Sequence, residues 1–238
     1  YNRDLARQCK QLRERIRGQL DDFCSRYDID LPGRAKPAQL PRVLAQMTRA
    51  LLLRMIQMAE MRDPRETGAH VNRVASYSVE IYELWAKHKG LPDREIQVNR
   101  DILRMAAMLH DIGKVAISDL ILKKPARFSR EEFEIIKSHT WQGAKIFMES
   151  QSAFDEAARD VAVSHHENWD GSGYPRGIGG EEIPQMARIL RAGEAFDDLL
   201  ESMEEGRMTG EEVLEQTLKL RGTSLDPAVA DILISMVR

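Results

Sequence analysis

The sequence predicts an all-α fold, a helical bundle with an N-terminal helical extension, and three observations support this. Apolar residues recur at spacings of three and four along nearly every segment, which is the period of a helix with one buried face. No segment alternates apolar and polar residues as a half-buried strand would. Hydrophobic residues make up 42% of the 238 residues and charged residues 31%, which suits a globular, helix-rich chain.

Residues 1–57 are predicted to form the N-terminal extension, and residues 58–238 the main domain. The extension begins with an amphipathic segment over residues 3–27, and three prolines and a glycine then indicate a linker over residues 28–41. A helical stripe of coiled-coil type follows at Leu44, Met47, Leu51, Met55 and Met58. This stripe fits either a core-facing helix or a dimer stalk that relays a signal through residues 38–60.

Helical periodicity continues to the end of the chain. Helices are expected over residues 71–84 and 102–109, then around 133–147 and 157–164, and finally over 189–200, 211–220 and 226–238. Asp226 is a natural cap for the last helix, with Pro227 at its first position. The longest loop is expected from Trp169 to Pro184, because it contains five glycines.

Composition narrows the functional class and the setting. The net charge of −3 gives no electrostatic case for a nucleic-acid polymer as partner. Cys9 and Cys24 form no metal-type pair and fit a reducing cytoplasm. The longest apolar stretch is interrupted by Arg54, so no membrane span or contact is expected. Because the chain begins with Tyr1, we expect a fragment of a larger protein with an upstream sensor domain.

Five of the six histidines lie beside acidic or small residues, whereas His88 lies in a polar run and is expected at the surface. Glu66 and His70 are four residues apart and would share one face of a helix. That spacing can deliver a carboxylate oxygen and an imidazole nitrogen to one metal, although an exposed pair is the more common explanation of such a spacing.

The segment "MLHDIGK" places charged groups at the end of an apolar run. His110 and Asp111 should therefore lie at a partly buried helix end, where a carboxylate needs a cationic partner or a metal. Lys114 follows one turn later. It fits either a plain ion pair with Asp111 or a ligand for a phosphate oxygen beside metals.

Three further histidines and two carboxylates complete the candidate set. His139 follows the segment "EEFEIIKS", and His165 and His166 end a predicted helix. Adjacent helical residues point about 100° apart, which suits two neighbouring metals better than one. Glu194 and Asp197 lie on a later helix. Nitrogen and oxygen donors without a thiolate favour an open, multinuclear site for Fe or Mn, ahead of Zn or Ni.

Three motifs together resemble the HD-GYP family of phosphodiesterases, a branch of the HD-domain metallohydrolases. They are "ETGAH" at residues 66–70, "HDIGK" at 110–114 and "HHENWDGSGYP" at 165–175, in the family's order and roughly its spacing. The segments "ILKKPARFSREEFEIIKSH" and "IPQMARIL" are also similar to the family. The resemblance covers about residues 58–238.

The resemblance implies an all-helical HD domain that holds two or three divalent metals and hydrolyses cyclic di-GMP to pGpG and onward to GMP in the bacterial cytoplasm. By position, it implies these metal ligands: Glu66, His70, His110, Asp111, His139, His165, His166 and Glu194. Lys114 matches the lysine that contacts the scissile phosphate, and Gly173, Tyr174 and Pro175 form the substrate-side loop that names the family.

The implied reaction is attack on phosphorus by a hydroxide that bridges two metals, with Asp111 orienting it and Lys114 holding the non-bridging oxygens. The sequence departs from the family twice. Glu194 stands where the family usually has Asp, and residues 200–212 are acidic, with Arg207 as their one basic residue, where the family usually has a basic segment. These departures leave two alternatives: a catalytically weak, metal-bound regulatory module, or a phosphohydrolase acting on another nucleotide. A homodimer through the N-terminal helices is also considered.

Overall fold

The computed structural model describes residues 14, 50, 51 and 54–56 and the ranges 68–149 and 152–237. Contacts divide the chain into two compact units, residues 1–52 and 53–238. The predicted helix over 3–27 lies outside the described residues except for residue 14. The linker over 28–41, the boundary after residue 57 and the candidate ligand Glu66 lie outside them entirely.

Every regular element of the described residues is a helix, which confirms the predicted all-α class. An isolated bridge joins Arg221 and Leu225. The longer helices are α3 (Gly68–His88), α4 (Asp93–Met108), α8 (Ala153–Ser164), α9 (Gln185–Glu204), α10 (Gly210–Leu220) and α11 (Pro227–Val237). The shorter ones are η1 (Ile112–Ala116), α5 (Asp119–Leu122), α6 (Arg130–Lys137), α7 (His139–Ile146) and η2 (Gly180–Glu182).

Two predicted helices differ from the observed ones for local reasons. The helix expected over residues 102–109 begins at Asp93, directly after Pro92, with Asp93 and Glu95 in its first turn. Acidic residues there stabilise the helix N-terminus, although this polar half carries little apolar periodicity. The segment expected around residues 133–147 is divided into α6 and α7 at Ser138. The predicted cap of the last helix is observed, since Asp226 accepts a hydrogen bond from the Ala228 amide at 2.8 Å.

The main core lies between α3, α4, α9 and α11. Helix α3 contacts the other three helices, and α9 also contacts α11. Apart from Leu225, which precedes α11, its buried residues lie on helices, each of which turns one apolar face inward. They are Ile81, Tyr82, Ala86, Ile96, Leu103, Ile189, Ala192, Phe196, Leu225, Val229, Ala230 and Leu233. This core fixes α3, α4 and α9, whose ends and faces supply part of the candidate site.

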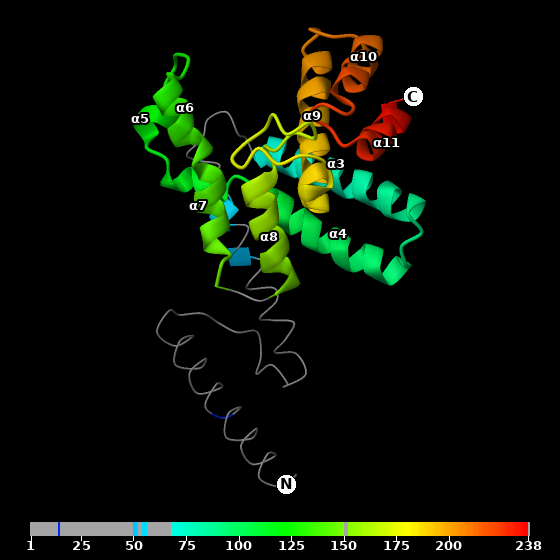
Figure 1. Cartoon of the computed structure of the whole chain (residues 1–238), viewed down its shortest axis with the longest axis horizontal. Helices are drawn as coiled ribbons and strands as arrows, with labels where there is room; N and C mark the ends of the chain where they lie inside the picture. Colours follow the sequence, from blue (N-terminus) through cyan, green and yellow to red (C-terminus); the bar gives the residue numbers. More distant parts are fainter. Residues whose placement is uncertain (1–13, 15–49, 52–53, 57–67, 150–151, 238) are drawn as a thin grey trace. The chain divides into compact units, whose positions relative to one another are not determined.

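A second set of contacts brings the remaining site helices together. Helix α7 packs against both η1 and α8, and α8 packs against α4 and α9. Figure 1 shows α8 between α7 and α9. The end of α4, the start of α7, the end of α8 and the middle of α9 thereby surround one region.

Three surface features bear on the sequence predictions. Leu51 and Met55 are the described residues of the predicted stripe, and they are 57% and 43% exposed. These two positions therefore do not face a core, and the dimer stalk stays a prediction. His88 is exposed at the end of α3, as expected. Within the described ranges, none of the helices combines the length and apolar composition needed to cross a bilayer.

Candidate metal centre

His110 and Asp111 lie in the turn between α4 and η1. Helix α4 ends at Met108, Leu109 caps it, and the tight η1 turn begins at Ile112. His110 is buried and Asp111 nearly so, as expected for groups at the end of an apolar helix face. The η1 turn brings Lys114 back toward Asp111, and the Nζ–Oδ2 distance is 3.0 Å.

His139 reaches the same region because η1 and α7 approach closely. A Cβ added at Gly113 would lie 1.9 Å from the carbonyl oxygen of His139 and 2.5 Å from the amide nitrogen of Gly143. No side chain fits in that space, so glycine allows the two backbones to touch. His139, the first residue of α7, is thereby held against the Asp111 turn, with Nε2 2.9 Å from Asp111 Oδ1.

His165 and His166 follow the last turn of α8. His165 is fully buried, and its Nε2 lies 3.3 Å from Nε2 of His139 and 3.5 Å from Asp111 Oδ1. The two adjacent rings have centroids 4.0 Å apart. His166 also lies beside His139, with centroids 5.2 Å apart. Both members of the pair therefore border the Asp111 carboxylate region.

In three of the histidine rings, a backbone carbonyl determines which of the two nitrogens carries a proton. Nδ1 of His110 lies 2.6 Å from the Ala107 carbonyl, and Nδ1 of His139 lies 2.6 Å from the Ile136 carbonyl. Nδ1 of His165 lies 3.0 Å from the carbonyl of Ala162 and 3.1 Å from that of Val161. A carbonyl oxygen only accepts hydrogen bonds, so Nδ1 carries the hydrogen in each ring. In the neutral ring, Nε2 then carries no hydrogen, and its lone pair can bind a metal.

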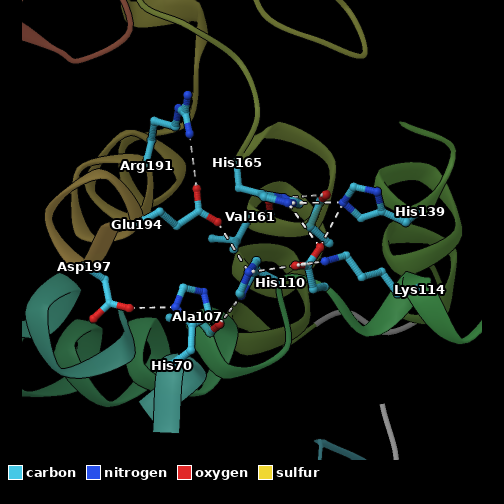
Figure 2. A network of polar contacts seen from close by, with 12 residues as sticks. His70, Ala107, His110, Lys114, His139, Val161, His165, Arg191, Glu194 and Asp197 are labelled. Atoms are coloured by element: carbon cyan, nitrogen blue, oxygen red, sulfur yellow. Dashed lines mark hydrogen bonds and ion pairs between the residues drawn. The ribbon is translucent and has the colours of Figure 1, made fainter. Parts of the chain in front are cut away.

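These Nε2 atoms point toward one another and toward carboxylates, as Figure 2 shows. Nε2 of His110 lies 3.1 Å from Asp111 Oδ2 and 3.3 Å from Glu194 Oε1. Lone pairs of nitrogen and anionic oxygen at such distances repel one another unless a cation lies among them. The neutral tautomers assigned above supply no proton at Nε2, so the donor set fits a metal cation.

Two overlapping groups of donors meet the geometric requirement for metal binding. In each group, one ligand atom per residue lies within 4.8 Å of the ligand atoms of all the others. The first group comprises Asp111, His139, His165 and His166, and the second comprises His110, His165 and Glu194. His165 belongs to both groups, so they adjoin. Nitrogen and oxygen donors without sulfur are typical of open sites for Fe, Mn or Zn.

Burial prepares the histidine pair for metal binding. It lowers the pKa of His165 and lowers that of His166 well below the ordinary value of 6.5, because the charged imidazolium loses its hydration there. The neighbouring His165 ring adds to the effect at His166. Both rings are therefore neutral at physiological pH, which is the form that binds metals.

Glu194 reaches the centre from α9, where its side chain is 12% exposed. Its Oε1 faces His110, and its Oε2 lies 3.6 Å from Nη1 of Arg191, one turn earlier on the same helix. The longer side chain at the position where the family usually has Asp therefore reaches a donor group in this chain.

His70 takes a different place from the other candidate ligands and belongs to neither donor group. Its Nδ1 lies 2.6 Å from Oδ2 of Asp197. Arg73 donates to both oxygens of the same carboxylate, at 2.6 and 2.9 Å. Burial alone would raise the pKa of Asp197, but hydrogen bonds from His70 and Arg73 outweigh it and lower that pKa. The ionised carboxylate then holds the hydrogen on Nδ1, so Nε2 is the nitrogen of His70 that could bind a metal.

The glycine-rich loop closes over His166. The Tyr174 ring lies 4.6 Å from the His166 ring between centroids, and burial raises the pKa of its hydroxyl. Tyr174 donates its amide to the His166 carbonyl at 3.1 Å. A Cβ at Gly173 would lie 2.4 Å from that same carbonyl oxygen, so only glycine permits this approach.

The start of the loop is held by backbone hydrogen bonds. Trp169 donates its amide to the carbonyl of Ser224, and Asp170 donates its amide to that of Thr223. Pro175 follows Tyr174 directly in the loop.

Four residues of the site were not among the predicted site residues. Glu167 is buried and accepts the Arg176 amide at 2.8 Å, and Arg176 donates Nη2 to Ser164 at 2.8 Å, which fastens the far end of the loop to α8. Arg73 and Arg191 pair with Asp197 and Glu194. Glu167 adjoins the histidine pair in the sequence, so its position was a usable signal. No motif marks the arginines. Arg73 reaches Asp197 on another helix, whereas Arg191 and Glu194 are three residues apart on α9, a spacing that ordinary surface pairs also have.

Comparisons with known proteins agree with this architecture. The HD-domain family matches residues 39–229. The chain is 34% identical to a Vibrio cholerae protein named 3'3'-cGAMP-specific phosphodiesterase 2, over 80% of this chain and 35% of the relative. It is 35% identical to the cyclic di-GMP phosphodiesterase response regulator RpfG of Xanthomonas campestris, over 81% of this chain and 50% of the relative. The chain thus spans half or less of the length of these curated relatives.

A solved structure shows the same fold. It is that of a cyclic GMP-AMP-specific phosphodiesterase of V. cholerae, V-cGAP3, which superposes with a TM-score of 0.52 at 18% identity. The alignment covers 77% of this chain and 47% of the other. At that identity the likeness extends to the fold alone.

Proposed function

Because the chain belongs to the HD-GYP branch of the HD-domain family, we propose that it is a metal-dependent phosphodiesterase acting on a cyclic dinucleotide. The proposed substrate is cyclic di-GMP, with pGpG and then GMP as products. The names of the relatives RpfG and a Thermotoga maritima protein, both cyclic di-GMP phosphodiesterases, support this choice. The relative named as cGAMP-specific makes 3'3'-cGAMP the second candidate substrate.

One observation carries the proposal: the Nε2 atoms of His110, His139 and His165 converge on Asp111 with their Nδ1 hydrogens held by backbone carbonyls. A structural ion-pair cluster would place a proton donor opposite each carboxylate oxygen. Here Lys114 lies beside Oδ2 of Asp111, but the lone pairs of His139 and His165 face Oδ1, which is the arrangement of a metal site with oriented ligands.

Two groups of residues would hold divalent metals, which we propose to be Fe or Mn ahead of Zn or Ni. The first is Asp111, His139, His165 and His166, and the second is His110, His165 and Glu194. His70, oriented by Asp197, is proposed to complete a two-metal centre, or a three-metal centre together with Glu66. When bound, such metals supply positive charge to the phosphate oxygens and an activated water nucleophile.

The protein's own groups divide the remaining work. Asp111 faces both donor groups through its two oxygens, so it would fix their separation and orient the nucleophile. Lys114 Nζ lies at the edge of the centre, 3.0 Å from Asp111 Oδ2, where it can hold a non-bridging oxygen of the scissile phosphate. Tyr174, over His166, would border the bound nucleotide and exclude water from that side.

The setting of the activity is proposed from the sequence. We place the chain in the bacterial cytoplasm, downstream of a sensor domain and paired with a second copy through the N-terminal helices. Cross-linking of the full chain, with and without residues 1–57, would detect that pairing.

The test is turnover of cyclic di-GMP and 3'3'-cGAMP by protein loaded with Fe or Mn after anaerobic purification. Chromatography should show pGpG followed by GMP from the first substrate, and metal analysis should give at least two metals per chain. Asp111→Ala should abolish turnover while circular dichroism stays helical. A loaded protein that binds either dinucleotide without cleaving it would instead support a regulatory module, and cleavage of other nucleotides alone would support a different phosphohydrolase.

A further inference from the structure

The arginines around the centre differ in how firmly they are held. Arg73 makes two bonds of 2.6 and 2.9 Å to Asp197, and Arg188 donates to Asp226 at 2.6 Å. Arg176 donates to Ser164 at 2.8 Å. These three guanidinium groups are engaged in short hydrogen bonds that fix the surrounding helices and loop.

Arg191 is held loosely by comparison. Its Nη1 lies 3.6 Å from Glu194 Oε2 and its Nη2 lies 3.5 Å from Asn168 Oδ1. Its Nε is buried and, like that of Arg188, makes no hydrogen bond within the described part of the chain. The side chain is 29% exposed, so solvent and ligands reach it. A planar guanidinium whose two Nη groups make only such long contacts at a site edge suits bidentate binding of an anion.

Arg191 and Lys114 border the centre on different sides. Figure 2 shows Arg191 beside Glu194 on one side of the cluster and Lys114 on the other, with His110 and His165 between them. Asn168 begins the glycine-rich loop, so Arg191 also adjoins the wall that carries Tyr174. The charges of both Arg191 and Lys114 act on the Tyr174 hydroxyl, which places that hydroxyl within electrostatic reach of both cations.

We propose that Arg191 binds the second, non-scissile phosphate of a cyclic dinucleotide. The inference rests on the proposed function, since a cyclic dinucleotide carries two phosphodiesters. When one phosphate lies at the centre beside Lys114, the other remains an unneutralised anion that needs a cation elsewhere on the site. Arg191 lies across the cluster from Lys114 with both Nη groups in long contacts, and it makes the α9 face a determinant of specificity for two-phosphate substrates.

The experiment compares a two-phosphate and a one-phosphate substrate, cyclic di-GMP and bis(4-nitrophenyl) phosphate. Arg191→Gln should lower kcat/KM for cyclic di-GMP by about 10- to 100-fold relative to the one-phosphate diester, the range for loss of a charged hydrogen bond. Arg191→Lys should recover only part of the ratio, because a point charge cannot bind bidentately. Arg100→Gln is the matched control, since Arg100 lies in a distant, half-exposed pair with Glu83 on α3 and α4.

A binding measurement separates the two proposals. The bis-phosphorothioate analogue of cyclic di-GMP is cleaved slowly, and its Kd for the metal-loaded protein should rise about 10- to 100-fold in Arg191→Gln with unchanged metal content. Equal losses on both substrates, or a loss of bound metal, would show that Arg191 only supports Glu194. An unchanged Kd would equally overturn the inference. The parent protein could bind the analogue more tightly than Arg191→Gln does and yet cleave no cyclic dinucleotide. In that case the proposed function fails and the inference stands.

Discussion

Gly113→Ala should displace one wall of the metal centre without altering any ligand. The added Cβ would lie 1.9 Å from the His139 carbonyl oxygen, whereas ordinary contact begins at 3.4 Å. The atoms it meets are backbone, which cannot turn aside as a side chain would. Helix α7 and the η1 turn must therefore separate by about 1.5 Å, several times the tolerance of about 0.5 Å for a preorganised site.

The displacement acts directly on the pair between His139 and Asp111, whose ligand atoms are 2.9 Å apart. A misplacement of about 1 Å can cost about 100-fold in rate. We therefore expect a loss of at least about 100-fold in kcat/KM, together with weaker metal binding. Overpacking of this buried contact should also lower the free energy of unfolding by about 1–3 kcal/mol.

Two other glycines provide a graded control. A Cβ at Gly143 would lie 3.3 Å from Gly113 N, a mild contact, and one at Gly210 would meet nothing within 4 Å. Losses in metal content by mass spectrometry, in kcat/KM and in urea midpoint should therefore increase from Gly210→Ala through Gly143→Ala to Gly113→Ala. Parental metal content and turnover in Gly113→Ala would refute the reasoning, because they would mean that the approach of α7 to η1 does not position His139.

Three further predictions concern other groups. Asp197→Asn should weaken metal binding about 10- to 100-fold, since it loses the anion that orients His70; a chelator competition that gives the parental affinity would contradict this. Lys114→Ala should keep its metals but lose about 10²–10³-fold in kcat, as removal of one transition-state donor does, and a smaller loss would exclude Lys114 as a phosphate ligand. Asp231 is held by Arg221 through bonds of 2.7 and 2.9 Å that lower its pKa below the ordinary 3.8. A depressed carboxyl pKa gives stability that is present above the unfolded pKa and lost as pH falls through the folded one. The urea midpoint of the parent should thus exceed that of Asp231→Asn near neutral pH, and this difference should shrink below about pH 4; a constant difference would exclude linkage through this carboxyl.

The helical class and the position of one candidate turn follow from local sequence. Apolar residues at helical spacing, followed by His110 and Asp111, place the pair at the end of α4, where the structure has it. The start of α4 at Asp93 and the break at Ser138 were missed, because capping and turn geometry at those points leave little trace in the apolar pattern. The acidic residues 200–212 form the end of α9 and the start of α10, where Thr209 and Glu212 make a capping box.

The sequence by itself determined which residues can donate to a metal, since the chemistry of imidazole and carboxylate depends only on residue type. The tertiary structure decided how they group. It placed His165 in both donor groups, turned His70 to Asp197, and held the Nδ1 hydrogens of three histidines on carbonyls of the preceding turns, so that Nε2 faces the centre. It also left Arg191 loosely held beside Glu194. Helical spacing fixes neighbours within one helix, such as Arg191 and Glu194. The two donor groups instead join different helices, and their distances depend on how closely backbones approach at positions such as Gly113.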